Sequence, residues 1–161
     1  MSPDASGRTE RHPIDRFHGY YVEDLTIGMS AFFGKTVSDA DLVLFSGVSG
    51  DTNPLHLNRE FAKGTRFGGP IVHGMLTASF ISTVIGTRLP GPGCVYLTQS
   101  LRFRAPVRVG DTVEVRATVK EINLEKRRVT IETVCSVGET VVLDGEAHIL
   151  VPSRLQSDAI N

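Results

Sequence analysis

Apolar and polar residues alternate with a period of two through the second half of the chain. In the stretch DTVEVRATVKEIN, Val113, Val115, Ala117 and Val119 fall on one side and polar residues fall on the other. This alternation is typical of an antiparallel strand with one buried face. The pattern predicts four strands with short, turn-rich connections, at residues 95–107, 111–123, 127–137 and 140–151.

The first half of the chain shows helical spacing instead. Residues 36–50 are predicted to form a helix that begins with a capping box between Ser38 and Asp41 and ends at Gly50. Residues 58–64 predict a second, short helix with an asparagine cap at its start and a glycine at its end.

A third segment, residues 73–86, is apolar or small on nearly every side, which indicates a helix buried on most of its faces. A strand near residues 28–37 adds to the four later strands. These elements predict an α+β fold, in which a curved antiparallel sheet of five strands wraps around the apolar helix. We expect one domain, residues 19–153, between a polar N-terminal tail (1–18) and a C-terminal tail (154–161).

Composition narrows the classes of function. The chain has 161 residues and a formal net charge of −1, so it lacks the basic field that binds nucleic acid. No apolar run is long enough to cross a membrane, and the first residues contain no secretory signal. Cys94 and Cys135 lack the spacing of metal ligands, which fits a reducing compartment. We therefore expect a cytoplasmic protein without a membrane or nucleic-acid partner.

The stretch SGDTNPLH, residues 49–56, places a carboxylate and an imidazole close together in the chain. Pro54 excludes a continuous helix between Asp51 and His56 and predicts a turn, which Asn53 can stabilise with its side chain. Such a turn can bring the two side chains to one side as an acid/base pair. The alternative is a surface turn in which both residues are solvated.

A second candidate lies where the apolar helix begins. The first N–H groups of a helix have no internal partner, and Gly74 would let a ligand oxygen approach its N–H closely. The alternative is that Gly74 allows close packing against a strand. His73 is expected to be a neutral, hydrogen-bonded residue of the supporting structure, because the helix dipole disfavours its charged form. No P-loop, dinucleotide fingerprint or metal-spaced cluster occurs, so no cofactor or metal is expected.

Three stretches together resemble the MaoC-like dehydratases, the R-specific enoyl-CoA hydratases. They are SGDTNPLH (49–56), GGPIVHGM (68–75) and YLTQSLRFRAPVRVGD (96–111), and the resemblance covers roughly residues 20–152. It implies a hot-dog fold, with a long central helix wrapped by a five-stranded antiparallel sheet. It also implies a homodimer, or a higher homo-oligomer, that takes an acyl-CoA thioester as substrate.

The resemblance further implies a role for each site residue. Asp51 and His56 would be the catalytic pair, and the Gly74 N–H would bind the thioester oxygen. Asn53 would shape the loop, and Ser82 matches a serine that the family keeps near the pair. The implied reaction is reversible syn addition of water to trans-2-enoyl-CoA, which gives (3R)-3-hydroxyacyl-CoA. Which member of the pair is base and which is acid stays open.

Two other functions remain as alternatives. Hot-dog thioesterases commonly place a carboxylate at or near the central helix, and residues 73–86 contain none. A non-catalytic acyl-CoA-binding subunit would have no need of Asp51 and His56. The acyl-chain length and the carrier, coenzyme A or acyl carrier protein, are left open by the sequence.

Overall fold

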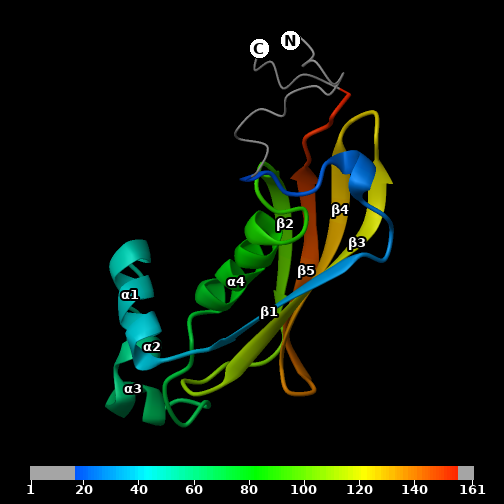
Figure 1. Cartoon of the computed structure of the whole chain (residues 1–161). Helices are drawn as coiled ribbons and strands as arrows, with labels where there is room; N and C mark the ends of the chain where they lie inside the picture. Colours follow the sequence, from blue (N-terminus) through cyan, green and yellow to red (C-terminus); the bar gives the residue numbers. More distant parts are fainter. Residues whose placement is uncertain (1–16, 156–161) are drawn as a thin grey trace.

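A computed structural model describes residues 17–155 of the chain. Five antiparallel strands form one sheet in the spatial order β1-β3-β4-β5-β2. Their bounds are β1 Ser30–Thr36, β2 Val95–Phe103, β3 Thr112–Asn123, β4 Arg128–Val137 and β5 Thr140–Leu150. The predicted hot-dog architecture is confirmed, because the long helix α4, Gly74–Thr87, lies across one face of this sheet (Figure 1).

Helix α4 buries one side against the sheet and leaves the other open in the single chain. The buried residues are Leu76, Thr77, Phe80, Ile81, Val84 and Ile85. Met75 and Ser82 are exposed on the opposite side. The prediction that this helix is buried on most of its faces was therefore wrong for the single chain. Its open side carries small residues and one methionine, which hydropathy does not distinguish from a buried face.

Three helices stand away from the sheet beside α4 (Figure 1). They are α1 Asp39–Ser49, α2 Pro54–Leu57 and α3 Arg59–Lys63. The predicted capping box at the start of α1 is confirmed, since the Ser38 and Asp41 side chains each accept a hydrogen bond from the other's backbone N–H. We name residues 38–63, which contain these helices, the overhang.

One local prediction in the overhang needs correction. The segment from Asp51 to His56 was expected to be a turn throughout, but His56 lies on α2. Gly50 already ends α1 four residues earlier, and Pro54 occupies the first turn of α2, where its missing N–H removes no helical bond. The proline therefore begins the helix that carries the histidine.

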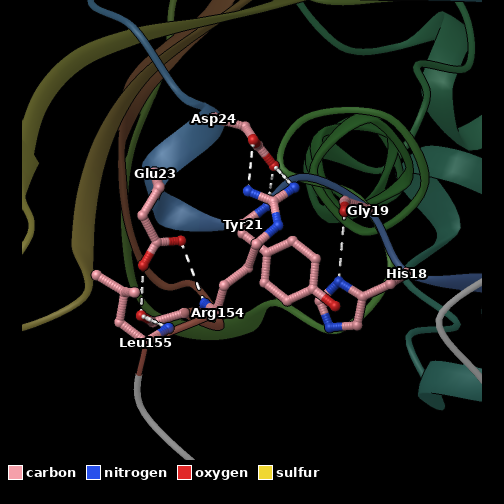
Figure 2. Close-up of polar contacts among 8 residues, drawn as sticks. His18, Gly19, Tyr21, Glu23, Asp24, Arg154 and Leu155 are labelled. Carbon is pink, nitrogen blue, oxygen red and sulfur yellow. Dashed lines mark hydrogen bonds and ion pairs between the residues drawn. The ribbon is translucent and has the colours of Figure 1, made fainter. Parts of the chain in front are cut away.

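Segments near the two ends of the described chain contact each other (Figure 2). Arg154 donates two hydrogen bonds of 2.7 Å to the Asp24 carboxylate, and its guanidinium lies 4.3 Å from the centre of the Tyr21 ring. His18 stacks on the same ring at 4.4 Å. Most residues of the two predicted tails lie outside the described range. Within that range, no helix combines the length and apolar character needed to cross a membrane.

Candidate active site

The loop after α1 orients the Asp51 carboxylate. Gly50 ends α1 in the left-handed conformation, with φ 77°, which glycine adopts without strain. Asp51 Oδ1 then accepts a hydrogen bond of 3.1 Å from the Asn53 N–H. Asn53 in turn caps α2, because its Oδ1 accepts a bond of 3.0 Å from the Leu55 N–H. The predicted stabilising role of the Asn53 side chain in this loop is confirmed.

The His56 ring is oriented by a main-chain carbonyl from the neighbouring segment. Its Nδ1 lies 2.8 Å from the Ile71 carbonyl oxygen. A carbonyl can only accept, so Nδ1 carries a proton and donates it. In the neutral ring, Nε2 then presents a lone pair that can accept a proton from a substrate or a water.

His73 connects these two residues from the protein interior. It is 1% exposed, and its Nε2 lies 3.1 Å from the Asp51 carbonyl oxygen and 3.2 Å from Ser46 Oγ. Its ring stacks on the His56 ring with 3.9 Å between centres. Burial lowers the pKa of His73, and the nearby His56 lowers it further. The lowered pKa and the two hydrogen-bond contacts agree with the expectation of a neutral, hydrogen-bonded His73.

Gly74 is the first residue of α4, so its N–H has no partner within the helix. A Cβ at this position would lie 2.7 Å from Cε1 of Phe103. Both interpretations of the glycine are compatible with this geometry: the Phe103 ring packs closely, and the amide stays uncovered by a side chain.

A cavity of about 300 Å³ lies beside the helix start. Its lining includes His56, Ile71, Gly74, Thr77 and Phe103. Two arginines also line it: Arg66, which follows the overhang, and Arg104, which follows β2. The structure therefore brings two of the predicted residues, His56 and Gly74, to one cavity. Arg104 also binds Asp144 through two hydrogen bonds, of 2.6 and 3.2 Å, which fix its guanidinium.

Two predicted residues lie differently. Asp51 is close to His56 and His73, with candidate ligand atoms of all three within 4.8 Å of one another, although it does not line the cavity. Ser82 lies eight residues beyond Gly74, or about 12 Å along the helix axis. It is exposed on the open side of α4, and no contact joins it to Asp51 or His56 within residues 17–155.

Sequence reasoning did not identify Ser46 and Phe103 as neighbours of the site. Ser46 is 27 residues from His73, and only the packing of α1 against the start of α4 brings them together. Phe103 lies in the β2 stretch that carries the resemblance, but nothing in the residue pattern indicates that its ring covers Gly74.

The cluster of Asp51, His56 and His73 is also the group within the described residues that could hold a metal ion. The ring geometry argues against this use. An imidazole binds a metal in its own plane at about 2.0–2.1 Å. The planes of the His56 and His73 rings differ by only 30°, and the ring centres are 3.9 Å apart. The two planes therefore intersect farther from the ring nitrogens than the length of a metal–nitrogen bond. The stack instead fits a single acid/base ring supported by a neutral one.

The chain is similar to a known family and to named proteins over most of its length. The family described as MaoC like domain matches residues 26–142. An (R)-specific enoyl-CoA hydratase from Rhodospirillum rubrum is 53% identical over 135 residues, which cover 84% of this chain and 94% of that protein. A 3-hydroxybutyryl-CoA dehydratase from Methylorubrum extorquens is 51% identical over 140 residues, covering 87% and 89%.

Solved structures of similar proteins share the architecture. The (R)-hydratase from Aeromonas caviae is 40% identical, with a TM-score of 0.78, and the match covers 81% of this chain and 99% of that one. An unliganded R-hydratase from Pseudomonas aeruginosa is 38% identical, with a TM-score of 0.80 and coverage of 89% and 95%.

Proposed function

The chain belongs to the MaoC-like dehydratase family, and we propose that it is a hydro-lyase acting on acyl-CoA thioesters. The reaction is reversible addition of water across the 2,3 double bond of a trans-2-enoyl-CoA. The product is a (3R)-3-hydroxyacyl-CoA. The relatives named as an (R)-specific enoyl-CoA hydratase and a 3-hydroxybutyryl-CoA dehydratase, each more than half identical to this chain, support the proposal.

One observation carries the assignment of roles. A carboxylate and an imidazole lie together, and the imidazole lines a cavity with Gly74, whose N–H has no partner within α4. Asp51 and His56 form the catalytic pair, and Gly74 supplies the oxygen-binding N–H. Asn53 holds the loop conformation through its cap on α2.

The chemistry follows from these positions. As the oxygen of water bonds to C3, the π electrons move toward the thioester carbonyl, whose oxygen gains negative charge. An N–H at a helix N-terminus stabilises this charge most strongly in the transition state. His56 Nε2 and the Asp51 carboxylate both accept hydrogen bonds, so they can hold the water and take its proton. The pair then delivers one proton to C2 on the same face.

The remaining parts of the proposal concern assembly and cofactors. The chain functions as a homodimer or a higher homo-oligomer, which the open side of α4 supports, because small residues there allow close approach of another copy. Ser82 lies on this open side. We assign it to the substrate-binding residues of the oligomer, because in the single chain it lies away from Asp51 and His56. No metal or cofactor is needed, and the cytoplasm is the compartment.

The test compares two site variants with a matched control. Asp51→Asn keeps the Oδ1 that accepts from Asn53, and His56→Gln removes the titratable ring. Each is expected to lower turnover of crotonyl-CoA by about 10²–10⁴-fold, the range for loss of general acid–base catalysis. Asp39→Asn makes the same chemical change at an exposed position of the overhang and should leave turnover unchanged.

Loss of the conjugated-thioester absorbance measures hydration, and chiral chromatography of the product tests its (3R) configuration. Near-normal turnover by Asp51→Asn or His56→Gln would overturn the assignment of the pair. Release of free thiol from acyl-CoA without hydration would instead identify a thioesterase. Saturable binding without turnover would identify a non-catalytic acyl-CoA-binding subunit.

A further inference from the structure

A single buried side chain contacts both members of the proposed catalytic pair. His73 Nε2 bonds to the Asp51 carbonyl oxygen at 3.1 Å, and the face of the same ring stacks on His56 at 3.9 Å. The next residue in the chain is Gly74, which lines the cavity. His73 thus contacts Asp51 and His56 and adjoins the third proposed group.

The contacts determine how the His73 ring is protonated. The Asp51 carbonyl can only accept, so Nε2 must carry the proton, which it also directs toward Ser46 Oγ at 3.2 Å. Nδ1 of the neutral ring then has a bare lone pair. It is buried without a hydrogen-bond partner among the described residues. A buried polar atom without a partner lowers the stability of the fold. We therefore expect the other contacts of the ring, through Nε2 and through its face, to offset this cost.

The loop that carries Asp51 depends on this contact. The other hydrogen bonds recorded for residues 51–53 within the described chain stay inside the overhang. Only the bond from His73 to the Asp51 carbonyl joins this short stretch to the segment leading into α4. Asp51 itself is exposed, so burial does not fix its position.

His56 depends on His73 in a different way. The hydrogen bond from Nδ1 to the Ile71 carbonyl holds one edge of the ring but allows rotation about that contact. The stacked His73 ring blocks this rotation on one face. Phe45 packs on His73 at 5.1 Å between ring centres and supports the stack from α1.

We propose that His73 is a positioning residue, which holds the Asp51 loop through its Nε2–H and the His56 ring through its face. The inference rests on the proposed hydration chemistry, but His73 itself touches no reacting atom. Its contribution is to keep the carboxylate and Nε2 of His56 directed at the same water.

Two substitutions separate the two contacts. His73→Phe keeps a flat ring against His56 and removes the donor to Asp51. His73→Gln keeps an N–H donor at the same reach and removes the ring face. A displacement of about 1 Å at an active site can cost as much as 10²-fold in rate, so we expect His73→Phe to lower kcat about 10–100-fold. KM for crotonyl-CoA should stay within about twofold, because the cavity lining is unchanged.

His73→Gln should lose less activity than His73→Phe, because the Asp51 loop stays attached. Val84→Ala is the control for destabilisation alone, since Val84 is fully buried on α4 ten residues beyond Gly74. It should lower the unfolding temperature without changing kcat. The proposal is overturned if His73→Phe retains kcat within twofold of wild type, if His73→Gln is no more active than His73→Phe, or if Val84→Ala loses kcat equally.

A measurement on the wild-type protein tests the contacts without any activity. Long-range ¹H–¹⁵N correlations of the histidine rings at neutral pH should show His73 protonated at Nε2 and His56 protonated at Nδ1. A charged His73, or one protonated at Nδ1, would overturn the proposal even if no variant folds. If wild-type protein hydrates no enoyl-CoA, the proposed function fails and this spectrum alone decides on His73.

Discussion

Gly74→Ala offers a sharp separation of activity from stability at this site. The new Cβ would lie 2.7 Å from Phe103 Cε1, whereas ordinary contacts begin at 3.4 Å. The ring must therefore retreat by about 0.7 Å or the start of α4 must shift. Either movement changes the cavity next to the N–H that we assign to the thioester oxygen.

The stability of the variant should change little. Phe103 is 55% exposed, so its ring can swing outward instead of being compressed. Gly74 is not among the glycines with positive φ. Replacing a glycine whose backbone conformation alanine can also adopt stabilises a protein by about 0.4–1 kcal/mol, because it restricts the unfolded chain. These opposing effects leave an expected net change below about 1 kcal/mol. Turnover should nevertheless fall about 10–100-fold, within reach of the 10²–10³ attributed to a lost oxyanion donor.

The assay is kcat/KM for crotonyl-CoA, together with the free energy of unfolding from urea denaturation. Gly47→Ala on α1 is the matched control, because a Cβ at this helical glycine has nothing within 4 Å. The double variant Gly74→Ala with Phe103→Leu removes the clash and tests whether ring displacement causes the loss. Because alanine keeps the N–H itself, Gly74→Ala with at least half of wild-type kcat/KM would refute the prediction that the substrate oxygen needs the space beside this amide.

Two further predictions concern stability. Gly145→Ala should lower the free energy of unfolding by about 3 kcal/mol, because its Cβ would lie 1.8 Å from the Ser100 carbonyl oxygen, a main-chain atom that cannot swing away. Gly34→Ala is the control, because a Cβ there has nothing within 4 Å, and it should leave the free energy of unfolding unchanged. Equal urea midpoints for the two variants would contradict this prediction. The pKa of His73 is lower in the folded chain than in the unfolded chain. Below about pH 6.5 the unfolded chain therefore binds a proton that the folded chain does not, and the contribution of His73 to stability falls as the pH falls toward its folded pKa. Urea unfolding between pH 7.5 and 5.5 should therefore show a steeper loss for wild type than for His73→Gln, and parallel curves would count against a neutral, buried His73.

Much of the fold follows from local patterns. Alternation with a period of two places the late strands, most plainly β3, whose buried and exposed positions alternate as one buried face requires. The capping box of Ser38 and Asp41 places the start of α1, because the relevant contacts span three residues. The candidate pair is visible for the same reason: Asp51 and His56 are five residues apart, and their motif is contiguous. The start of α2 at Pro54 was missed because a proline that cannot stand inside a helix is still tolerated in a helix's first turn.

The sequence by itself therefore determined most of the elements, the α+β class and the candidate pair Asp51 and His56, because their signals lie within short stretches of the chain. Only the tertiary structure decided how the candidates are arranged. The stack of His56 on His73, the bond from His73 to the Asp51 carbonyl and the approach of Phe103 to Gly74 join residues 17 to 29 positions apart. Such contacts arise when α1, the overhang loop and β2 pack around the start of α4, and packing of distant segments leaves no periodic trace along the chain. The same limit explains why the open side of α4 was mistaken for a buried one.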